Sequence, residues 1–591
     1  MTAGAAAYWV EEFDDAERAR LAPWFTNVDG PVFALRNLPE TVKGALFARY
    51  SRTGKSLRRL FLDEFADAAD ANAEARRSEA RLGVPIGTDR RVPIGTERRV
   101  PIGKEGQEAR RSEARLGVPI GTDMRVVRGP ATGEQRAAAL YQRVFDEYGD
   151  DSVAQLGGAH LACEQASNLL TKVLEWGRLA AYLEQSTRYV AYADRPGGRW
   201  RYHLDPEVVA DAELGPEYRR VLDGLFESYA ELVPALTEHL GRVVPHEAGS
   251  GEVAWRRAVK ARALDALRGL LPAATTSNLG IYATGQAYEA LLLRLAAHPL
   301  PEARTYGGLL LAELRKVIPA FLTRVDRADR GMAWSRYLAR TAEETARVVE
   351  DVLGPADSGL EGPSVRLTEF DPAGEDKVLT AAAYPHARAG EAEVAARVAR
   401  LGTDDRARLL AAYVGERENR RHKPGRAFER AVYTFDVVAD YGAFRDLQRH
   451  RLCTIVWQPL TPSLGYELPP DVEAAGQGDR FGAAMAASAG LYRALAPRFP
   501  AQAAYAVSLA HRIRFAMTLN ARELMHLAEL RSAPQGHPAY RAVAQAMHRL
   551  VAEEAGHRAL AEAMCFVVHD EVGLGRLDAE RRLEARRALA P

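Results

Sequence analysis

Two arginines flank a histidine at Arg449-His450-Arg451, where an amphipathic run over residues 435–451 ends. Three consecutive cationic or titratable side chains cannot all face a hydrophobic core. Arginine offers bidentate hydrogen-bond donors to phosphate or carbonyl oxygens, and a histidine ring can stack on a heterocycle or hydrogen-bond to it. Spacing alone favours a solvated surface cluster, and a site for a phosphate or a heterocycle is the alternative.

Other motifs that could carry chemistry are incomplete. Gly54-Lys55-Ser56 matches the end of a phosphate-binding loop, but Arg49 stands where that loop needs a glycine. Glu554 and His557 have the spacing of a metal-binding pair on a helix, but no second pair accompanies them. The three cysteines lie far apart, without the spacing of a zinc site or a disulfide framework. We therefore expect no metal centre.

Composition narrows the class of protein. The chain has 591 residues, enough for two to four domains, and its 79 basic residues balance its 79 acidic residues. A balanced charge disfavours general nucleic-acid binding. The N-terminal segment turns acidic, and no apolar stretch of membrane-spanning length follows it. We expect a cytoplasmic protein without a membrane partner.

The elements that must position these residues fall into two halves. Helical periodicity dominates both, with strand candidates at residues 31–39 and 364–372, which predicts an α+β class of two tandem, predominantly helical α/β halves. Gly, Pro and Ser at 354–363 mark a linker between the halves at 1–353 and 364–591. Sixteen residues at 74–89 recur at 108–123, so we read 74–123 as a disordered, dispensable surface insertion.

A family resemblance divides between the halves. R-H-R, preceded by Phe428-Glu429, resembles the signature of flavin-dependent thymidylate synthases, whose motif continues with a serine and then N-E-x-S-x-R-Y. The second half has Thr454 at the serine position and then departs from the motif. The first half has Trp176-Gly177-Arg178 in place of R-H-R but matches the tail at Glu184, Ser186, Arg188 and Tyr189. Each half keeps what the other has lost.

Two further elements extend the resemblance. Asn520 and Arg531 match the family's late helix, whose arginine contacts the uracil base, and their spacing of eleven places them on one helical stripe. The segment 268–272 is similar to the family's nucleotide-binding R-x-x-L-P element and begins with Arg268. Asp446 stands where the family usually has a dUMP-contacting glutamine, and Arg430 where a flavin-contacting histidine is usual.

The resemblance implies reductive methylation of dUMP to dTMP, with FAD as cofactor, NADPH and methylenetetrahydrofolate as co-substrates, and no cysteine nucleophile. Family members are homotetramers with active sites between subunits, so it also implies a homodimer that forms a pseudotetramer, with one site built from both halves. The implied nucleotide-binding residues are Glu184, Ser186, Arg188, Arg268 and Arg531, with Arg531 also catalytic, and the implied flavin-binding residues are Arg449, His450, Arg451 and Asn520. The alternatives are a non-catalytic flavin- or nucleotide-binding scaffold and a flavoenzyme acting on another pyrimidine nucleotide.

Overall fold

The computed structural model describes residues 8–9, 11–70, 141, 154–188, 190–246, 251–354, 362–570, 574–575, 577 and 581. The predicted insertion at 74–123, most of the predicted linker and Tyr189 lie outside these residues. The chain divides into two units, one formed by Met1–Leu62 with Ala154–Pro591 and the other by Asp63–Val153. The description below concerns the first unit, which contains every other predicted site residue.

In the residues that the structure describes, each half contains one four-stranded antiparallel sheet. In the first half β1 (Val32–Leu35), β2 (Gly158–Ser167), β3 (Ala180–Glu184) and β4 (Thr276–Thr284) pair in the order β1-β2-β4-β3. In the second half β5 (Ser364–Phe370), β6 (Val432–Asp440), β7 (Thr454–Trp457) and β8 (Arg512–Asn520) pair in the order β5-β6-β8-β7. The shared strand order indicates two copies of one topology, and both predicted strands are confirmed.

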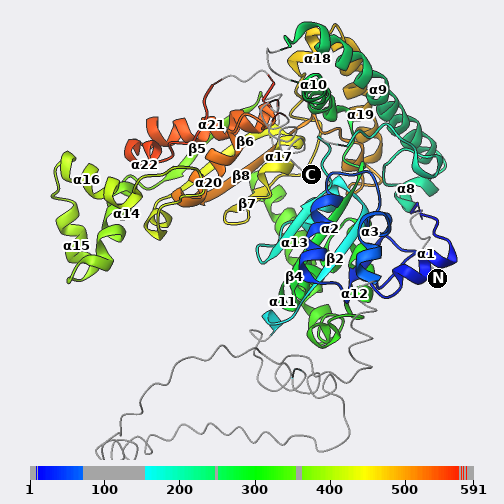
Figure 1. Cartoon of the computed structure of the whole chain (residues 1–591), viewed down its shortest axis with the longest axis horizontal. Coiled ribbons are helices and arrows are strands. Elements are labelled where there is room, and N and C mark those ends of the chain that lie inside the picture. The colour runs from blue at the N-terminus through cyan, green and yellow to red at the C-terminus, as the bar shows by residue number, and fades with distance from the viewer. Residues whose placement is uncertain are drawn as a thin grey trace, which may run out of the picture. The chain divides into compact units, whose positions relative to one another are not determined.

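Helices surround the two sheets (Figure 1). The first-half helices are α1 (Asp15–Leu21), α2 (Glu40–Tyr50), α3 (Leu57–Glu64), α7 (Asn168–Leu174), α8 (Pro206–Ala210), α9 (Leu214–Val243), α10 (Glu252–Leu267), α11 (Gly285–Ala297), α12 (Pro301–Leu314) and α13 (Gly331–Leu353). The second-half helices are α14 (Gly374–Ala383), α15 (Glu391–Val398), α16 (Thr403–Val414), α17 (Tyr441–Leu447), α18 (Pro470–Ala474), α19 (Gly478–Leu495), α20 (Ala521–Arg531), α21 (Pro538–Glu553) and α22 (Arg558–Glu562). The predicted α+β class is therefore confirmed.

The same local device starts a helix after four of the strands. A polar residue ends each strand and caps the next helix by accepting a hydrogen bond from a backbone amide near its start. The four caps are Ser167 for α7, Thr284 for α11, Asp440 for α17 and Asn520 for α20. The amphipathic run at 435–451 thus divides into the end of β6, helix α17 and the turn that carries R-H-R.

The two halves share one hydrophobic core. Helices α9 and α19 pack side by side, and buried residues of both halves belong to one contiguous cluster. Backbone hydrogen bonds join Ala273 N to Val507 O at 2.8 Å and Ala510 N to Gly269 O at 3.0 Å. The first half therefore packs directly on the second, and side chains from both halves can meet in one site.

Candidate functional site

Glu184 is a buried carboxylate that cationic side chains from both halves contact. It ends β3, and Arg445 of α17 donates to its Oε1 at 2.8 Å. Arg449 donates to its Oε2, and Lys172 Nζ of α7 lies 3.2 Å from the same oxygen. Arg445, Lys172 and Arg449 outweigh burial and hold the pKa of Glu184 well below its usual range. Glu184 is therefore an anion that fixes three cations.

Asp446 is the second carboxylate of the site and is partly buried. Its Oδ2 lies 3.3 Å from Arg268 Nη1, and its Oδ1 lies 3.8 Å from Arg531 Nη1 and 4.0 Å from Arg449 Nη1. Although burial opposes ionisation, Arg268, Arg449, Arg531 and Arg188 lower the pKa of Asp446 far below its usual range. Arginines from both halves thus converge on one carboxylate.

Arg188 is held by residues of both halves. Its Nε and Nη2 donate to the two carboxylate oxygens of Asp265, each at 2.8 Å. Its Nη1 donates to the Tyr540 hydroxyl at 2.8 Å, and its Nη2 also donates to the Gln535 carbonyl at 3.0 Å. A planar guanidinium with this many partners has little freedom to turn. The predicted first-half arginine is thereby fixed against the second half.

These side chains form a basic cluster, which we define as Lys172, Arg188, Arg268, Arg445, Arg449 and Arg531 with the carboxylates Glu175, Glu184, Asp265 and Asp446. Six formal positive charges face these four carboxylates, and Asp440 also lies near Arg268, so basic side chains remain in excess. Arg268 is only 3% exposed, and its Nε and Nη2 have no hydrogen-bond partner among the described residues. Buried donors normally have partners, so the cluster suits an anionic ligand with several oxygens.

His450 orients Arg531. Its Nε2 accepts from Arg531 Nε at 3.0 Å, so its proton lies on Nδ1 and is donated to Glu523 Oε1 at 2.9 Å. Burial and the neighbouring Arg531 hold the pKa of His450 well below its usual range, which keeps the ring neutral. Arg531 Nη2 in turn donates to the Asp446 carbonyl at 2.6 Å. Glu523, His450 and Arg531 form one chain of hydrogen bonds.

His450, Glu523 and His526 also place three potential metal-ligand atoms within 4.8 Å of one another. Both nitrogens of the neutral His450 ring are already hydrogen-bonded, and Arg531 and Lys423 add positive charge beside them. A cation would have to displace a proton next to two cationic groups, so the group does not fit a metal site. Glu554 and His557, which have the spacing of a pair on one helix, do not share a helix, because α21 ends at Glu553, and His557 hydrogen-bonds to Tyr433.

The remaining predicted residues lie around the cluster. Arg451 lies over the Tyr182 ring of the first half, with 5.9 Å between its guanidinium carbon and the ring centroid. Asn520 caps α20 by accepting from Glu523 N at 2.9 Å. Ser186 Oγ accepts from Arg188 N at 3.3 Å. No sequence motif indicated Lys172 and Arg445, although each stands five residues after the cap of its helix, at equivalent places in the two halves.

The duplication creates a second, equivalent position, and it is built differently. Trp176 corresponds to Arg449 in the R-H-R alignment, and Trp457 ends β7 as Glu184 ends β3. Their rings meet edge to face with centroids 5.6 Å apart, where the first position has the Arg449–Glu184 ion pair. Arg178 donates to Thr454 Oγ1 at 2.9 Å. Each chain therefore has one charged composite position and one aromatic counterpart.

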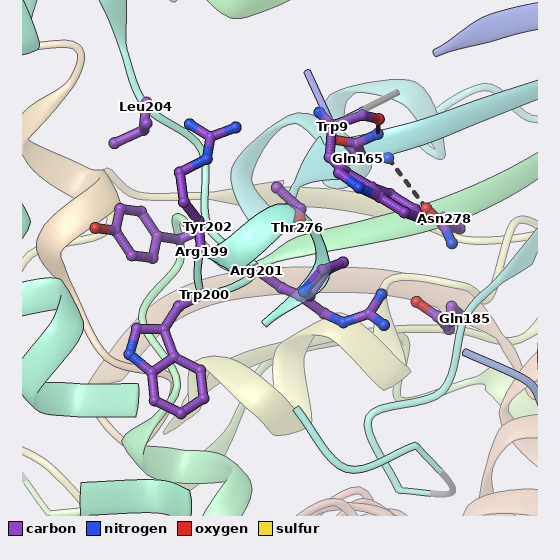
Figure 2. A pocket seen from close by; sticks show the side chains of 11 residues that line it. Trp9, Gln165, Gln185, Arg199, Trp200, Arg201, Tyr202, Leu204, Thr276 and Asn278 are labelled. Atoms are coloured by element: carbon purple, nitrogen blue, oxygen red, sulfur yellow. Dashed lines mark hydrogen bonds between the residues drawn. The ribbon is translucent and has the colours of Figure 1, made fainter. Parts of the chain in front are cut away.

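A separate pocket lies within the first half, and Figure 2 shows its side chains. The side-chain amide of Gln165 accepts from the Trp9 backbone N and donates to the Trp9 carbonyl, and the Gln165 backbone N donates to Asn278 Oδ1 at 3.0 Å. Gln185, the residue after Glu184, also lines it. In the second half the position of Asn278 is taken by Arg514, which is paired with Asp436. The pocket contains none of the predicted site residues.

Three comparisons relate the chain to known proteins. A family model described as "Thymidylate synthase complementing protein" matches residues 108–320 and 366–556, one region in each half. A "UPF0159 protein" of Chlamydia muridarum is 36% identical over 577 residues, 97% of this chain and 99% of that protein. Another, from Thermoplasma acidophilum, is 31% identical over 474 residues, 76% of this chain and 92% of that protein.

Two solved structures resemble about a third of the chain. One is the UMP/dUMP methylase PolB of Streptomyces cacaoi bound with 5-Br dUMP, at 20% identity and a TM-score of 0.27, covering 34% of this chain and 96% of that one. The other is thymidylate synthase X of Helicobacter pylori with FAD and dUMP, at 18% identity and a TM-score of 0.26, covering 34% and 99%.

Proposed function

Because the chain belongs to the thymidylate synthase complementing protein family, with one matched region in each half, we propose that it is a flavin-dependent thymidylate synthase. It methylates the uracil base of dUMP at one composite site per chain, using methylenetetrahydrofolate and NADPH. The observation that carries this proposal is the convergence of Arg268 of the first half with Arg449 and Arg531 of the second on Asp446, with Arg188 near enough to lower the pKa of that carboxylate.

The charge of the basic cluster supports a nucleotide monophosphate as ligand. A phosphate monoester carries about 1.5 to 2 negative charges at neutral pH, and the excess of basic side chains in the cluster attracts such a charge. In this proposal Arg188 and the unpaired donors of Arg268 hold the phosphate. Glu184 and Ser186 shape the pocket, because Glu184 fixes Arg449 and Ser186 accepts from the Arg188 backbone.

Arg531 acts on the base. The hydrogen bond from its Nε to His450 and the one from its Nη2 to the Asp446 carbonyl hold its guanidinium in one orientation. A guanidinium placed against a pyrimidine carbonyl stabilises negative charge on that oxygen and so favours electron density at C5, the carbon that accepts the one-carbon unit. We assign Arg531 as the catalytic residue, with His450 and Glu523 positioning it.

FAD is assigned to Arg449, His450, Arg451 and Asn520, and the charges around them suit its anionic diphosphate. The positive charges of Lys423 and Arg522 favour ionisation of Glu523, and that of Lys423 also lowers the pKa of His450. Further positive charge therefore lies beside R-H-R. The chemistry that bound flavin supplies is hydride transfer. The chain's own part is to hold the cofactor beside the base and to exclude water.

The cysteines support a reaction without a thiolate nucleophile. Cys163 and Cys453 are buried, and burial raises the pKa of the Cys453 thiol to about 12. A thiol with such a pKa is protonated at neutral pH and is a poor nucleophile. Cys565 is exposed and contacts Arg417, which belongs to a separate ion pair with Glu529.

The test is to purify the full chain and measure flavin absorbance near 450 nm, dUMP affinity and thymidylate formation. Arg188→Ala and Arg531→Ala should each weaken dUMP binding by roughly 2–5 kcal/mol while flavin stays bound, and Arg451→Ala should lower flavin content. Arg178→Ala, at the aromatic counterpart, is the matched control and should change neither. Unchanged dUMP affinity in Arg188→Ala would reduce the first half to a scaffold. Binding without turnover by the wild type would support the non-catalytic alternative.

Asp446 favours one second candidate, a reaction on another pyrimidine nucleotide. Its carboxylate replaces a neutral amide of the family pattern, and a carboxylate in a nucleotide site can accept hydrogen bonds from ribose hydroxyls. UMP and dUMP should therefore be compared as substrates in the same assay. Faster methylation of UMP, reversed in preference by Asp446→Gln, would favour the second candidate.

A further inference from the structure

Helix α13 presents an apolar face that the described part of the chain leaves uncovered. This 23-residue helix packs on α11 through its first turns, where Ser335 Oγ donates to the Leu293 carbonyl at 3.2 Å. From Thr341 to Leu353 every residue is exposed. Trp334 is 56% exposed and Val352 is 70% exposed. Large apolar side chains on one exposed helix face are typical of a contact surface.

The exposed face of α13 repeats with the period of a coiled coil. Trp334, Leu338, Thr341, Thr345, Val348 and Val352 follow one another at alternating steps of four and three residues, and we call these six residues the α13 seam. A step of 3.5 residues keeps a stripe facing a partner only when that partner is also an α-helix. The two threonines at the centre have short side chains that permit close approach and offer a methyl group to a partner. The seam therefore selects a helix as its occupant.

The distribution of charged residues along α13 is unfavourable for the helix dipole. The first half of the helix carries Arg336 and Arg340 and no acidic residue. The second half carries one arginine and four acids, which are Glu343, Glu344, Glu350 and Asp351. Acidic residues stabilise the start of a helix and basic residues its end, so this order is unfavourable in an isolated helix. An antiparallel copy of α13 would set each basic half against an acidic half.

We propose that α13 pairs antiparallel with α13 of a second copy of this chain and joins the two copies. The seam then places Trp334 of one copy opposite Val352 of the other, Leu338 opposite Val348, and Thr341 opposite Thr345. A two-fold axis passes between the helices at the level of residue 343, as in an isologous interface. A parallel pair would bring like charges together. The inference does not depend on the proposed reaction.

The first experiment measures the mass of the full-length protein by light scattering after size-exclusion chromatography. The double variant Val348→Glu/Val352→Glu should halve the mass of the assembly, because it buries two carboxylates against apolar partners. Leu353→Glu is the matched control, since Leu353 is equally apolar and 77% exposed but lies off the seam. The control should keep the wild-type mass. Circular dichroism checks that both variants are folded.

The second experiment tests the orientation of the pair by disulfide formation in a Cys565→Ser background, since Cys565 is the exposed native cysteine. Ala342→Cys lies one residue from the level of the proposed axis and should cross-link two copies under mild oxidation. Val352→Cys should not, because antiparallel helices separate the two copies of this residue by roughly 25 Å or more. Cross-linking of Val352→Cys alone would overturn the antiparallel arrangement. An unchanged mass in the double variant, or a monomeric wild type, would overturn the proposal.

Discussion

Asp446 lies in surroundings unlike those of an ordinary surface aspartate. Four arginines from both halves lower its pKa, and the nearest, Arg268, keeps two buried donors without a partner among the described residues. Asp446 therefore acts as an internal anion that reduces, without cancelling, the positive charge of the cluster. A ligand phosphate has to bind beside this carboxylate or take over some of its arginines.

We predict that Asp446→Asn destabilises the free protein and strengthens its binding of anions. Replacing the carboxylate leaves the four arginines short of one charge, which should cost on the order of 3 kcal/mol in the free energy of unfolding. The cluster then has one more unbalanced positive charge, so inorganic phosphate should raise the melting temperature more than in the wild type. Denaturant titrations with and without phosphate measure both effects.

The control is Asp471→Asn, which removes an arginine-paired aspartate outside the basic cluster, since Asp471 pairs with Arg262 at 2.7 Å. This control should lose some stability without any change in its response to phosphate. If phosphate stabilises Asp446→Asn no more than the wild type, the basic cluster is not an anion site.

Two histidines with lowered pKa values, the buried His511 and the half-buried His526, give a second prediction at the scale of residues. Burial lowers the pKa of His511 to about 4 and that of His526 to about 4, below the ordinary value near 6.5. Between pH 6.5 and 4 the unfolded chain binds protons at these positions and the folded chain does not. Stability should therefore fall as the pH falls, by about 1.4 kcal/mol per pH unit for each such histidine.

His511→Gln removes one of these groups and should flatten the pH dependence of the unfolding free energy between pH 6.5 and 5 by about one proton. Unfolding by denaturant at several pH values measures this slope. Glutamine retains a polar side chain at the position, so the comparison concerns the slope rather than the absolute stability. An identical slope in wild type and variant would show that His511 titrates normally in the folded protein.

At the scale of elements, four strands end on a residue that caps the following helix. Asn520 illustrates how structure and proposed function overlap, because it caps α20 and is also assigned to the flavin. The helix it starts carries Glu523, which accepts from His450, and ends at Arg531. The start of α20 therefore sets the position of the residues that orient the catalytic arginine.

We predict that two substitutions of Asn520 separate capping from flavin binding. Asn520→Ala should cost about 1 kcal/mol of stability, because an orphan amide of α20 loses its acceptor. Asn520→Ser restores a capping oxygen and should recover the stability, but not flavin content, because serine lacks the amide. Thermal unfolding and absorbance near 450 nm measure the two effects.

Thr284 is the control, since it caps α11 at the equivalent place in the first half. Thr284→Ala should lower stability without loss of flavin. Full flavin occupancy in Asn520→Ser would leave Asn520 with capping as its role and remove it from the cofactor site.

The elements also show which features a sequence can predict. The strands β1 and β5 were predictable because apolar residues gather or alternate between turn signals, and α20 because its family motif has helical spacing. The pattern of the run at 435–451 indicates one amphipathic segment, although the run contains the end of a strand and a helix. The end of β6 is buried on both faces, so apolar and polar residues do not alternate there. The partners of Glu184 were hidden for a different reason. Arg445 lies 261 residues away, and no local pattern encodes a contact at that separation.

At the scale of the whole molecule, the division of motifs between the halves predicted that their residues would lie together. Glu184 and Arg188 do lie with Arg449 and Arg531, but the network around them could not be read from motifs. Asp265 and Tyr540, which fix Arg188, are 77 and 352 residues from it along the chain.

No helix among the described residues is long and apolar enough to span a bilayer.

Because the halves share a core, we predict that they unfold in one transition. Six of the seven tryptophans precede the linker, so fluorescence reports mainly on the first half, whereas circular dichroism reports on both. The two signals should coincide during denaturation.

Gly269→Val should lower both midpoints together, with a loss of roughly 1–3 kcal/mol in the free energy of unfolding, because a Cβ at Gly269 would lie 2.9 Å from the Ala510 Cβ across the junction. Gly224→Ala, with open space around it, should lower neither midpoint. A separate second step in the dichroism signal alone would mean that the halves are independent, and a site built from both would then lack a rigid frame.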